Sequence, residues 1–425
     1  MTDDGHEPLK VACRLGIVHL PRQVCYNEVQ GAHVMPGNTV LPAHNGMVIT
    51  RGLQEMACLL PLDLPFATVE RLLAWETQCE EMICATEVRC LVRAHGQVIR
   101  EAEAAEVTEL LERGDLSDLK AQLVPAREVR RPAAWPEELS VAVEQALEAE
   151  EPQPPEGVRA CDWERVLTAR REECADIARL RRLGPEVQPG QIVAATDDVE
   201  VRRPERKSKL YIRTARIATR EGFRYLSGCG ETVLNQLYLL LLLCGGLHGW
   251  VTVLGDGARW IRSFFTQRLA AFTHKELVLD WYHLVKKCYE LTSMICHGRK
   301  AKAALIGRLI PRLWHGQVDD AVAQLESYRP ECRNEEKLNG LINYLTARKP
   351  YIVDYKERRA NRIYIGSGHA EKANDLIVSR RQKHKGMHWS EATADGLAAL
   401  KTLVLNNGWD LYWQERKVLP LAIPA

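Results

Sequence analysis

The most restrictive feature of this sequence is the order of β-like and helical segments after Gln191. Three runs with β character, QIVAATDDVEVR, KLYIRTARIA and GFRYLSG, are separated by short polar turns. The helix ETVLNQLYLLLLLCGG follows and is closed by a glycine pair. The strand WVTVLGD, a helix from about Trp260, the strand KELVLD and the helix WYHLVKKCYELTSMIC complete the series. This order predicts an α/β domain.

Three strands followed by alternating helices and strands is the order of a ribonuclease-H-like domain, although fold order alone is an analogy and not a mechanism. We expect this domain over residues 190–405. Helical periodicity in AALIGRLIPRLWHGQVDDAVAQLESY and EEKLNGLINYLTAR predicts a helical insertion within it at about 300–360. Residues 406–425 are predicted to form a C-terminal tail.

The first 150 residues predict a mixed β and helical region. Residues 1–60 contain short β-like runs separated by Gly, Pro and Asn, which indicate a small β-rich module. In residues 61–151, FATVERLLAWETQ and ATEVRCLVRAHG predict two helices of about a dozen residues, typical either of a helix-turn-helix that binds DNA or of a plain helical pair. IREAEAAEVTELLER and LSDLKAQL predict further helices, and Pro-rich segments predict a linker and helix over 152–189.

The small net charge of +1 conceals a strong segregation of charge. Residues 101–151 hold 14 acidic and 5 basic residues, a balance of −9, so the rest of the chain carries +10. Basic residues cluster at 201–216, 347–362 and 379–388. Such clusters are typical of solvated faces when they occur singly, whereas three in one half of the chain favour contact with phosphates.

Cysteine usage and apolar runs favour a cytoplasmic protein. The 13 cysteines form no CxxC pair, which fits a reducing compartment. Cys13, His19 and Cys25 are candidate zinc ligands at the N-terminus, but they lack the paired spacing of a zinc knuckle. The longest apolar run, Leu237 to Cys244, is shorter than the roughly 20 residues of a membrane span, so no membrane association is expected.

Three carboxylates are candidate metal ligands. Asp256 lies between two glycines at the end of a strand, where it is either a turn residue and helix cap or a ligand with glycines that leave room for ion and substrate. Strand alternation places Asp197 on the face of neighbouring valines and Asp198 on the other, and a charge among valines needs a partner. We therefore favour Asp197. Glu371 follows a glycine-serine-glycine turn and begins a helix, where an ordinary surface glutamate is the alternative.

The sequence resembles the DDE transposases of bacterial insertion sequences, and most closely the ISKra-type group. The resemblance rests on ATDDVEVR, TARIATREGFRYLSG, VLGDGARWIRSFF, LDWYHLVKK and GSGHAEK with KGMHW, in the family's order over roughly residues 190 to 400. It implies that Asp197, Asp256 and Glu371 are the catalytic, metal-binding residues. Asp280 and His283 match a supporting Asp-x-x-His signature of related transposases, for which a helix cap and a satisfied core histidine are the alternative.

The resemblance implies metal-dependent cleavage of transposon ends and strand transfer into target DNA. Carboxylate ligands suit Mg²⁺ or Mn²⁺, and two ions about 4 Å apart would serve both oxygens of the displacement. The implied partners are double-stranded DNA and further copies of the chain, in a bacterial cytoplasm close to the nucleoid. Arg380, Arg381 and Lys383 are candidate phosphate contacts, and Trp389 is a candidate stacking residue or a core tryptophan. A domesticated ribonuclease-H-like nuclease and an inactive DNA-binding protein are the alternatives.

Overall fold

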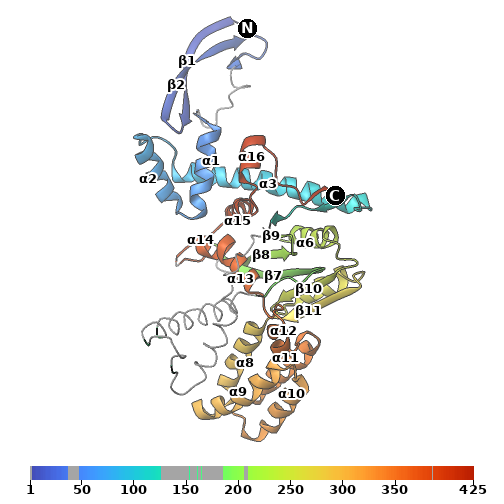
Figure 1. The fold of residues 1–425 in the computed structure, drawn as a ribbon. Coiled ribbons are helices and arrows are strands. Elements are labelled where there is room, and N and C mark those ends of the chain that lie inside the picture. Colours follow the sequence, from blue (N-terminus) through green and yellow to red (C-terminus); the bar gives the residue numbers. More distant parts are fainter. Residues whose placement is uncertain are drawn as a thin grey trace.

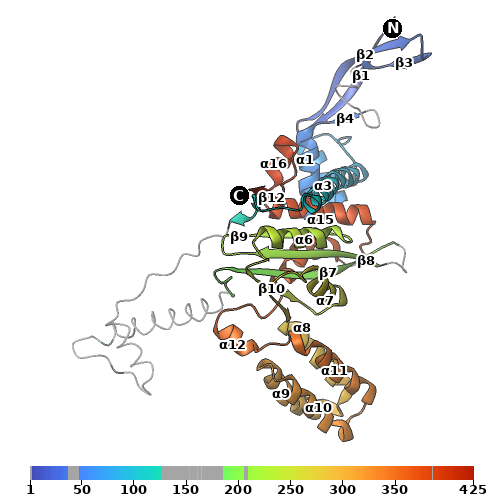
Figure 2. The same cartoon turned by 90° about the vertical axis from the view of Figure 1, so that its right-hand side faces the viewer.

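The computed structural model describes residues 2–36, 47–125, 185–204, 209–384 and 386–425, together with the isolated positions 153, 160 and 164. The protein has a mixed α/β fold. In both views an N-terminal sheet lies at one end of the molecule, a six-stranded sheet in the middle and a group of helices at the other end (Figures 1 and 2). Most of the predicted linker and helix at 152–189 lies outside the described residues.

The N-terminal sheet has the order β3-β2-β1-β4. A long antiparallel hairpin dominates it, and a short strand runs parallel to its first strand; the strands are β1 (Thr2–Cys13), β2 (Gly16–Asn27), β3 (Ala32–Val34) and β4 (Met47–Ile49). Cys13 pairs with Gly16 beside the turn, whereas Cys25 pairs with Asp3 near the open end. The two cysteines are therefore about 30 Å apart along the hairpin. They cannot bind one zinc ion together.

Helices α1 (Arg51–Leu59) and α2 (Phe66–Thr77), with the short turn η2 (Leu60–Leu62) between them, lead into the long helix α3 (Ala85–Arg113). The prediction of a second helix of about a dozen residues was wrong, because α3 continues through Gly96. A Cβ on Gly96 would lie 2.3 Å from the Cα of Gly396 in α15 (Glu391–Leu405). Gly96 thus marks a close crossing of two helices and not a helix end.

The prediction of a helix in LSDLKAQL was also wrong. This segment contains β5 (Leu119–Ala121), which pairs antiparallel with β12 (Ala422–Pro424) near the C-terminus. The last residues also include α16 (Trp409–Glu415), and Arg224 donates hydrogen bonds to the carbonyl oxygens of Leu419 and Pro420. Residues 406–425 are therefore a packed part of the fold and not a free tail.

The central sheet has the order β11-β10-β7-β8-β9-β6. Its five long strands occur where the sequence predicts them: β7 (Gln191–Arg202), β8 (Lys209–Ala218), β9 (Gly222–Gly228), β10 (Trp250–Gly255) and β11 (His274–Leu279). The first three form an antiparallel meander, β10 and β11 run parallel to β7, and β6 (Val124–Pro125) pairs with β9. Helix α6 (Thr232–Leu243) connects β9 to β10, and α7 (Arg259–Ser263) with η3 (Phe264–Arg268) connects β10 to β11.

Side chains of β7 alternate between two apolar layers. Ile192 and Ala194 pack in a core with α6 and α7, whereas Val193 and Ala195 pack on the opposite face with α8 (Trp281–Ile295). Further along that second face, Val199 packs in the core that includes α15. Asp197 occupies the position between these two apolar groups, so the second face carries a half-buried carboxylate at its centre.

Helices α8 to α12 form the group at the far end from the N-terminus (Figure 1). They are α8, α9 (Gly298–Trp314), α10 (Val318–Ser327), α11 (Glu335–Arg348) and α12 (Tyr355–Ala360), with the short turns η4 (Arg329–Glu331) and η5 (Lys349–Tyr351). The group begins directly after β11 and not near residue 300, because buried residues of α8 such as Leu284 and Cys288 share one core with α9 and α11.

After this group the chain returns to β7 as one nearly continuous helix. It comprises α13 (Gly368–Asn374), the π-helical segment η6 (Asp375–Ser379) and α14 (Arg380–Gln382). Helix α13 packs on β7 and β8, and α15 follows it in the sequence. In the part of the chain that the structure describes, no helix has the length and apolar character that a bilayer crossing requires.

Candidate active site

Three aspartates lie side by side across adjacent strands of the central sheet. Leu254 of β10 is in register with Ala195 of β7, so Asp256, two residues later, lies beside Asp197. Gly255 is likewise in register with Leu279 of β11, which places Asp256 beside Asp280. Neighbouring strands are about 4.8 Å apart. The register of these strands thus gathers carboxylates that are 24 to 83 positions apart in the sequence, one within β7 and two directly after β10 and β11.

Asp197 is half-buried and has both oxygens engaged. Its Oδ2 accepts a hydrogen bond of 2.7 Å from Nδ2 of Asn374 in α13, and its Oδ1 accepts one of 2.8 Å from the backbone N–H of Asp198. The hydroxyl of Thr214 on β8 donates to the amide oxygen of Asn374, which fixes the orientation of that amide. Burial and the nearby Asp256 carboxylate raise the pKa of Asp197 to about 6.

Asp198 points to the opposite face of the sheet. Its Oδ2 accepts a hydrogen bond of 3.2 Å from the indole N–H of Trp260 in α7, and the Arg213 guanidinium lies 5.0 Å from the centre of that indole ring. Burial, followed by the charge of Asp256, raises the pKa of Asp198. The two adjacent aspartates therefore belong to different surroundings, and both lie within electrostatic reach of Asp256.

Asp256 forms the turn after β10. Its Oδ1 accepts a hydrogen bond of 2.7 Å from the backbone N–H of Ala258, as a turn aspartate does. The structure gives the flanking glycines a role in packing and in the backbone turn, in addition to the expected room for a ligand. A Cβ on Gly255 would lie 2.7 Å from Cδ1 of Ile261, and Gly257 has a φ of +75°, so close packing and a left-handed backbone require these glycines.

Asp280 is buried and acts as a hub of hydrogen bonds. It is the N-cap of α8, and its Oδ1 accepts from the backbone N–H of His283 at 2.8 Å and lies 3.1 Å from Nδ1 of that ring. Its Oδ2 accepts from the hydroxyl of Ser367 at 2.8 Å and from the backbone N–H of the same residue. These hydrogen bonds outweigh burial and lower the pKa of Asp280. Asp280 therefore ties the start of α13 to the end of β11.

His283 connects this hub to the remaining carboxylates. The hydrogen bond to Asp280 is the main reason that its pKa is raised, and the charges of Asp197 and Asp256 act in the same direction. Its Nδ1 lies 3.9 Å from Oε1 of Glu371, which extends from the first turn of α13. The His283 side chain is 28% exposed, so it is not a core histidine. Asp280 is a helix cap, as the alternative interpretation expected, and His283 also contacts Glu371.

The close-packed ligand group differs from the set that the sequence suggests. Among the residues that the structure describes, Asp280, His283 and Glu371 are the group of three metal-type side chains whose ligand atoms lie within 4.8 Å of one another. Asp197 and Asp256 are neighbours by strand register and are coupled to His283 electrostatically. The site therefore consists of a tight trio beside a pair of aspartates, and Glu371 belongs to the trio.

The chemistry of these donors fits a hard divalent cation. The site is lined by four carboxylates and one imidazole, and none of these five side chains is a cysteine. Oxygen ligands of this kind suit Mg²⁺ or Mn²⁺. Burial raises the pKa of Asp197, and the charge of the nearby Asp256 carboxylate adds to the rise. A bound cation would offset that repulsion.

The predicted DNA contacts fall into two classes. Arg380 and Lys383 are exposed, and Nε of Arg380 pairs with Oδ2 of Asp375 at 2.8 Å. Arg381 is buried and donates from Nε to the carbonyl oxygen of Pro61 at 2.7 Å. Trp389 is also buried and donates its indole N–H to the carbonyl oxygen of Gln382 at 3.0 Å. The two exposed side chains therefore lie at the surface, where Arg380 is paired with Asp375, whereas the buried pair lines a pocket.

Sequence reasoning missed residues that hold the site in place. Asn374 lies one helical turn after Glu371, and this i, i+3 spacing on one helix face was the available signal. Ser367 occupies the glycine-serine-glycine turn that was recognised only as a helix start. Arg348 of α11 donates to the carbonyl oxygen of Gly257 at 3.4 Å, and no local pattern relates these two residues, which are 91 positions apart.

Comparison with known proteins assigns no family to this chain. Neither the models of protein families nor the curated proteins include a match to it. An assignment of function therefore has to come from the geometry of the site.

Proposed function

We propose that this protein is a DDE transposase that cleaves the ends of a mobile DNA element and joins them to target DNA. The observation that carries the proposal is the convergence of Asp197, Asp256 and Glu371 around His283. These carboxylates come from β7, from the end of β10 and from α13, and they share electrostatic coupling to one imidazole. Paired carboxylates on a rigid sheet are suited to metal-assisted transfer at a phosphodiester.

The order of the strands supports a ribonuclease-H-like catalytic domain. The antiparallel meander β7-β8-β9 is extended on the β7 side by the parallel strands β10 and β11. If β7 to β11 are numbered 1 to 5 along the chain, their order across the sheet is 3-2-1-4-5. Asp197 lies on the central strand of the five and Asp256 follows its neighbour. This arrangement is what the resemblance to DDE transposases implies, and fold likeness alone does not assign a reaction.

Asp197, Asp256 and Glu371 would hold divalent cations, which supply charge to the attacking and leaving oxygens of a phosphodiester. In cleavage, a water oxygen forms a bond to phosphorus, the bond from phosphorus to the 3′-oxygen breaks, and that oxygen leaves with a proton as a 3′-hydroxyl. In joining, the oxygen of this hydroxyl forms a bond to a phosphorus of the target strand, the bond from that phosphorus to the target 3′-oxygen breaks, and the proton of the hydroxyl ends on the leaving 3′-oxygen. DNA is thus the proposed partner, with assembly of several copies on the two ends.

The other residues of the site position these carboxylates. Asn374 holds Asp197 through one hydrogen bond while Thr214 holds Asn374. Asp280 fixes Ser367, and with it the first turn of the helix that bears Glu371. The hydrogen bond to Asp280 raises the pKa of His283, whose Nδ1 lies 3.9 Å from Oε1 of Glu371. We assign Asp280 and His283 a positioning role.

The test is a cleavage and joining assay on a plasmid that carries the gene with its flanking DNA. With Mg²⁺ or Mn²⁺ we expect cuts at two element ends and joined products. Asp197→Asn, Asp256→Asn and Glu371→Gln should each lower the rate about a hundredfold or more, because each removes a metal-binding charge. Asp198→Asn should have a smaller effect.

Asp375→Asn is the matched control. Asp375 is an acidic residue on the same continuous helix as Glu371, it pairs with Arg380 at the surface, and its neutralisation should leave the rate unchanged. Undiminished cleavage by Asp256→Asn protein would remove the proposal. Tight DNA binding without any cleavage would favour the DNA-binding protein, and cleavage without joining would favour the nuclease.

A further inference from the structure

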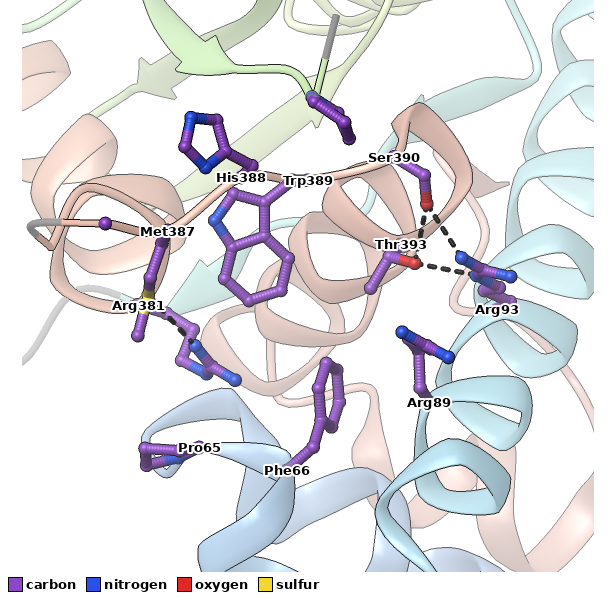
Figure 3. Close-up of a pocket in the computed structure, with 12 residues that line it drawn as sticks. Pro65, Phe66, Arg89, Arg93, Arg381, Met387, His388, Trp389, Ser390 and Thr393 are labelled. Atoms are coloured by element: carbon purple, nitrogen blue, oxygen red, sulfur yellow. Dashed lines mark hydrogen bonds between the residues drawn. The ribbon is translucent and has the colours of Figure 1, made fainter.

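A second feature of the protein is a pocket of about 500 Å³ between the N-terminal helices and the segment after α14. It is lined from α2 and α3 by Phe66, Arg89 and Arg93, and from the opposite side by Arg381 and residues 386–390. Figure 3 shows the Phe66 and Trp389 rings near the middle, with Arg381 and Met387 on one side and Arg89 and Arg93 on the other. Its volume lies within the roughly 300–1,000 Å³ of small-molecule sites.

The pocket concentrates positive charge without acidic lining residues. Arg89, Arg93 and Arg381 all line it, and no Asp or Glu does so in the described part of the chain. Arg93 donates from Nε to Oγ1 of Thr393 at 2.7 Å and from Nη2 to Oγ of Ser390 at 2.9 Å (Figure 3). These hydroxyls are neutral, so the guanidinium charge of Arg93 stays uncompensated there. Such a surface favours an anion.

The same pocket is also lined by two aromatic residues, of which Phe66 is half-buried and Trp389 is 6% exposed. The Phe66 and Trp389 rings meet edge to face with centres 6.1 Å apart. The guanidinium of Arg381 lies over both rings, at 5.2 Å from the first and 4.8 Å from the second. Arg381 is 4% exposed, and none of its hydrogen bonds among the described residues is to a carboxylate. Aromatic and guanidinium planes next to unpaired positive charge are suited to a base with its phosphate.

The continuous helix of α13, η6 and α14 connects this pocket to the carboxylates. Glu371 is in its first turn, and Arg381 is near its end. Ten residues of helix separate them, a rise of about 15 Å. This distance is one that a few nucleotides of an extended strand can span.

We propose that this pocket binds one unpaired nucleotide, with its base against Phe66 and Trp389 and its phosphate at Arg89 and Arg93. The proposal that this nucleotide belongs to a DNA strand rests on the proposed function. The recognised chemistry is a nucleoside monophosphate, which occurs either free or within a DNA strand, and the experiment separates these two sources.

The experiment measures binding by fluorescence anisotropy in buffer with EDTA, so that no catalysis takes place. Three labelled or competing probes are used: a fully paired duplex, the same duplex with one extra unpaired nucleotide, and free deoxyadenosine monophosphate. We expect tighter binding of the bulged duplex than of the paired one. Arg89→Ala should reduce this preference about tenfold through loss of a phosphate contact. Arg299→Ala removes an equally exposed arginine of α9 and should preserve the preference.

Crosslinking provides a second measurement that does not depend on the folding of a variant. With 5-iododeoxyuridine as the unpaired nucleotide, ultraviolet light should couple the DNA of the wild-type complex to residues 386–390. Equal binding of paired and bulged duplexes, or crosslinks that map elsewhere, would overturn the proposal. Competition by the free monophosphate with no preference for the bulge would assign the pocket to a free nucleotide and also overturn the strand-bound form.

The outcome can be separated from that of the proposed function. Asp256→Asn protein should keep the preference for the bulged duplex although it loses cleavage, because Asp256 lies outside the pocket. No cleavage by the wild-type protein in the plasmid assay, with retained preference for the bulged duplex, would reject only the catalytic proposal. Retained cleavage by wild-type protein without any preference would reject only the pocket.

Discussion

Replacement of Asp197 by asparagine is expected to stabilise the cation-free protein while it abolishes the proposed activity. Burial and the charge of Asp256 raise the pKa of Asp197 from 3.8 to about 6. The folded state therefore binds a proton at this carboxyl more tightly than the unfolded chain does. The stability associated with this proton is fully present below pH 3.8 and is lost as the pH rises through about 6. Asparagine resembles the protonated acid in shape and lacks this loss.

The size of the effect follows from the shift. Two pKa units correspond to about 3 kcal/mol for this half-buried charge. Asparagine has one acceptor oxygen and loses one of the two hydrogen bonds that Asp197 accepts, a cost of about 1 kcal/mol, so we expect a net gain of about 1–2 kcal/mol at pH 7.5. At pH 4.5 the wild-type carboxyl is largely protonated, and the gain should fall to about 1 kcal/mol or less. For a domain of this size the gain at pH 7.5 raises the melting temperature on the order of 5 °C.

Thermal melting in EDTA at pH 4.5, 6 and 7.5 tests this reasoning. Asp320→Asn neutralises an exposed aspartate and should change the free energy of unfolding by no more than about 0.5 kcal/mol at each pH. A variant that is no more stable than the wild type at pH 7.5 would show that repulsion and burial do not destabilise the Asp197 charge. A gain of equal size at all three values of pH would show that titration of this group is not its cause.

Three other outcomes are expected. Gly96→Ala should lower the free energy of unfolding by about 1–3 kcal/mol or more, because its Cβ would lie 2.3 Å from Gly396 Cα. Gly307→Ala, with nothing within 4 Å, should raise the free energy of unfolding by about 0.5–1 kcal/mol. Urea titration measures both variants, and an unchanged stability of Gly96→Ala would contradict the close crossing of the two helices. Asp280→Ala should cost about 2–5 kcal/mol because it leaves buried donors without acceptors, and a loss below 1 kcal/mol in the same titration refutes the hub. Mn²⁺ or Mg²⁺ should raise the melting temperature of the wild type but not of Asp256→Asn, and calorimetry that detects no divalent binding speaks against a cation site.

The elements around the site were largely predictable because their signals are local. β-branched alternation marks β7, and the glycine pair after α6 marks its end. The same alternation separates Asp197 from Asp198, since consecutive side chains of a strand point to opposite faces. The structure places them accordingly, with Asn374 beside one and Trp260 beside the other.

Predictions failed where a distant partner decides the local structure. The segment LSDLKAQL has helical periodicity, but β5 forms in it because the chain end supplies a pairing strand about 300 positions later. Gly96 resembles a helix breaker, yet α15 crosses α3 at that point and only a residue without a side chain fits there. A window of local sequence contains neither partner, so no reading of periodicity could find them.

The sequence alone determined the strand and helix order of the central domain and the presence of acidic residues within β7 and directly after β10 and β11. Tertiary structure alone decided how those residues meet. Register placed Asp256 between Asp197 and Asp280, and the helix that returns after α12 brought Glu371 next to His283. The order of elements depends on short-range propensity and hydrophobic periodicity, which the sequence carries locally. The convergence of side chains depends on sheet register and on the packing of elements whose site residues are 24 to 88 positions apart, which only the folded chain specifies.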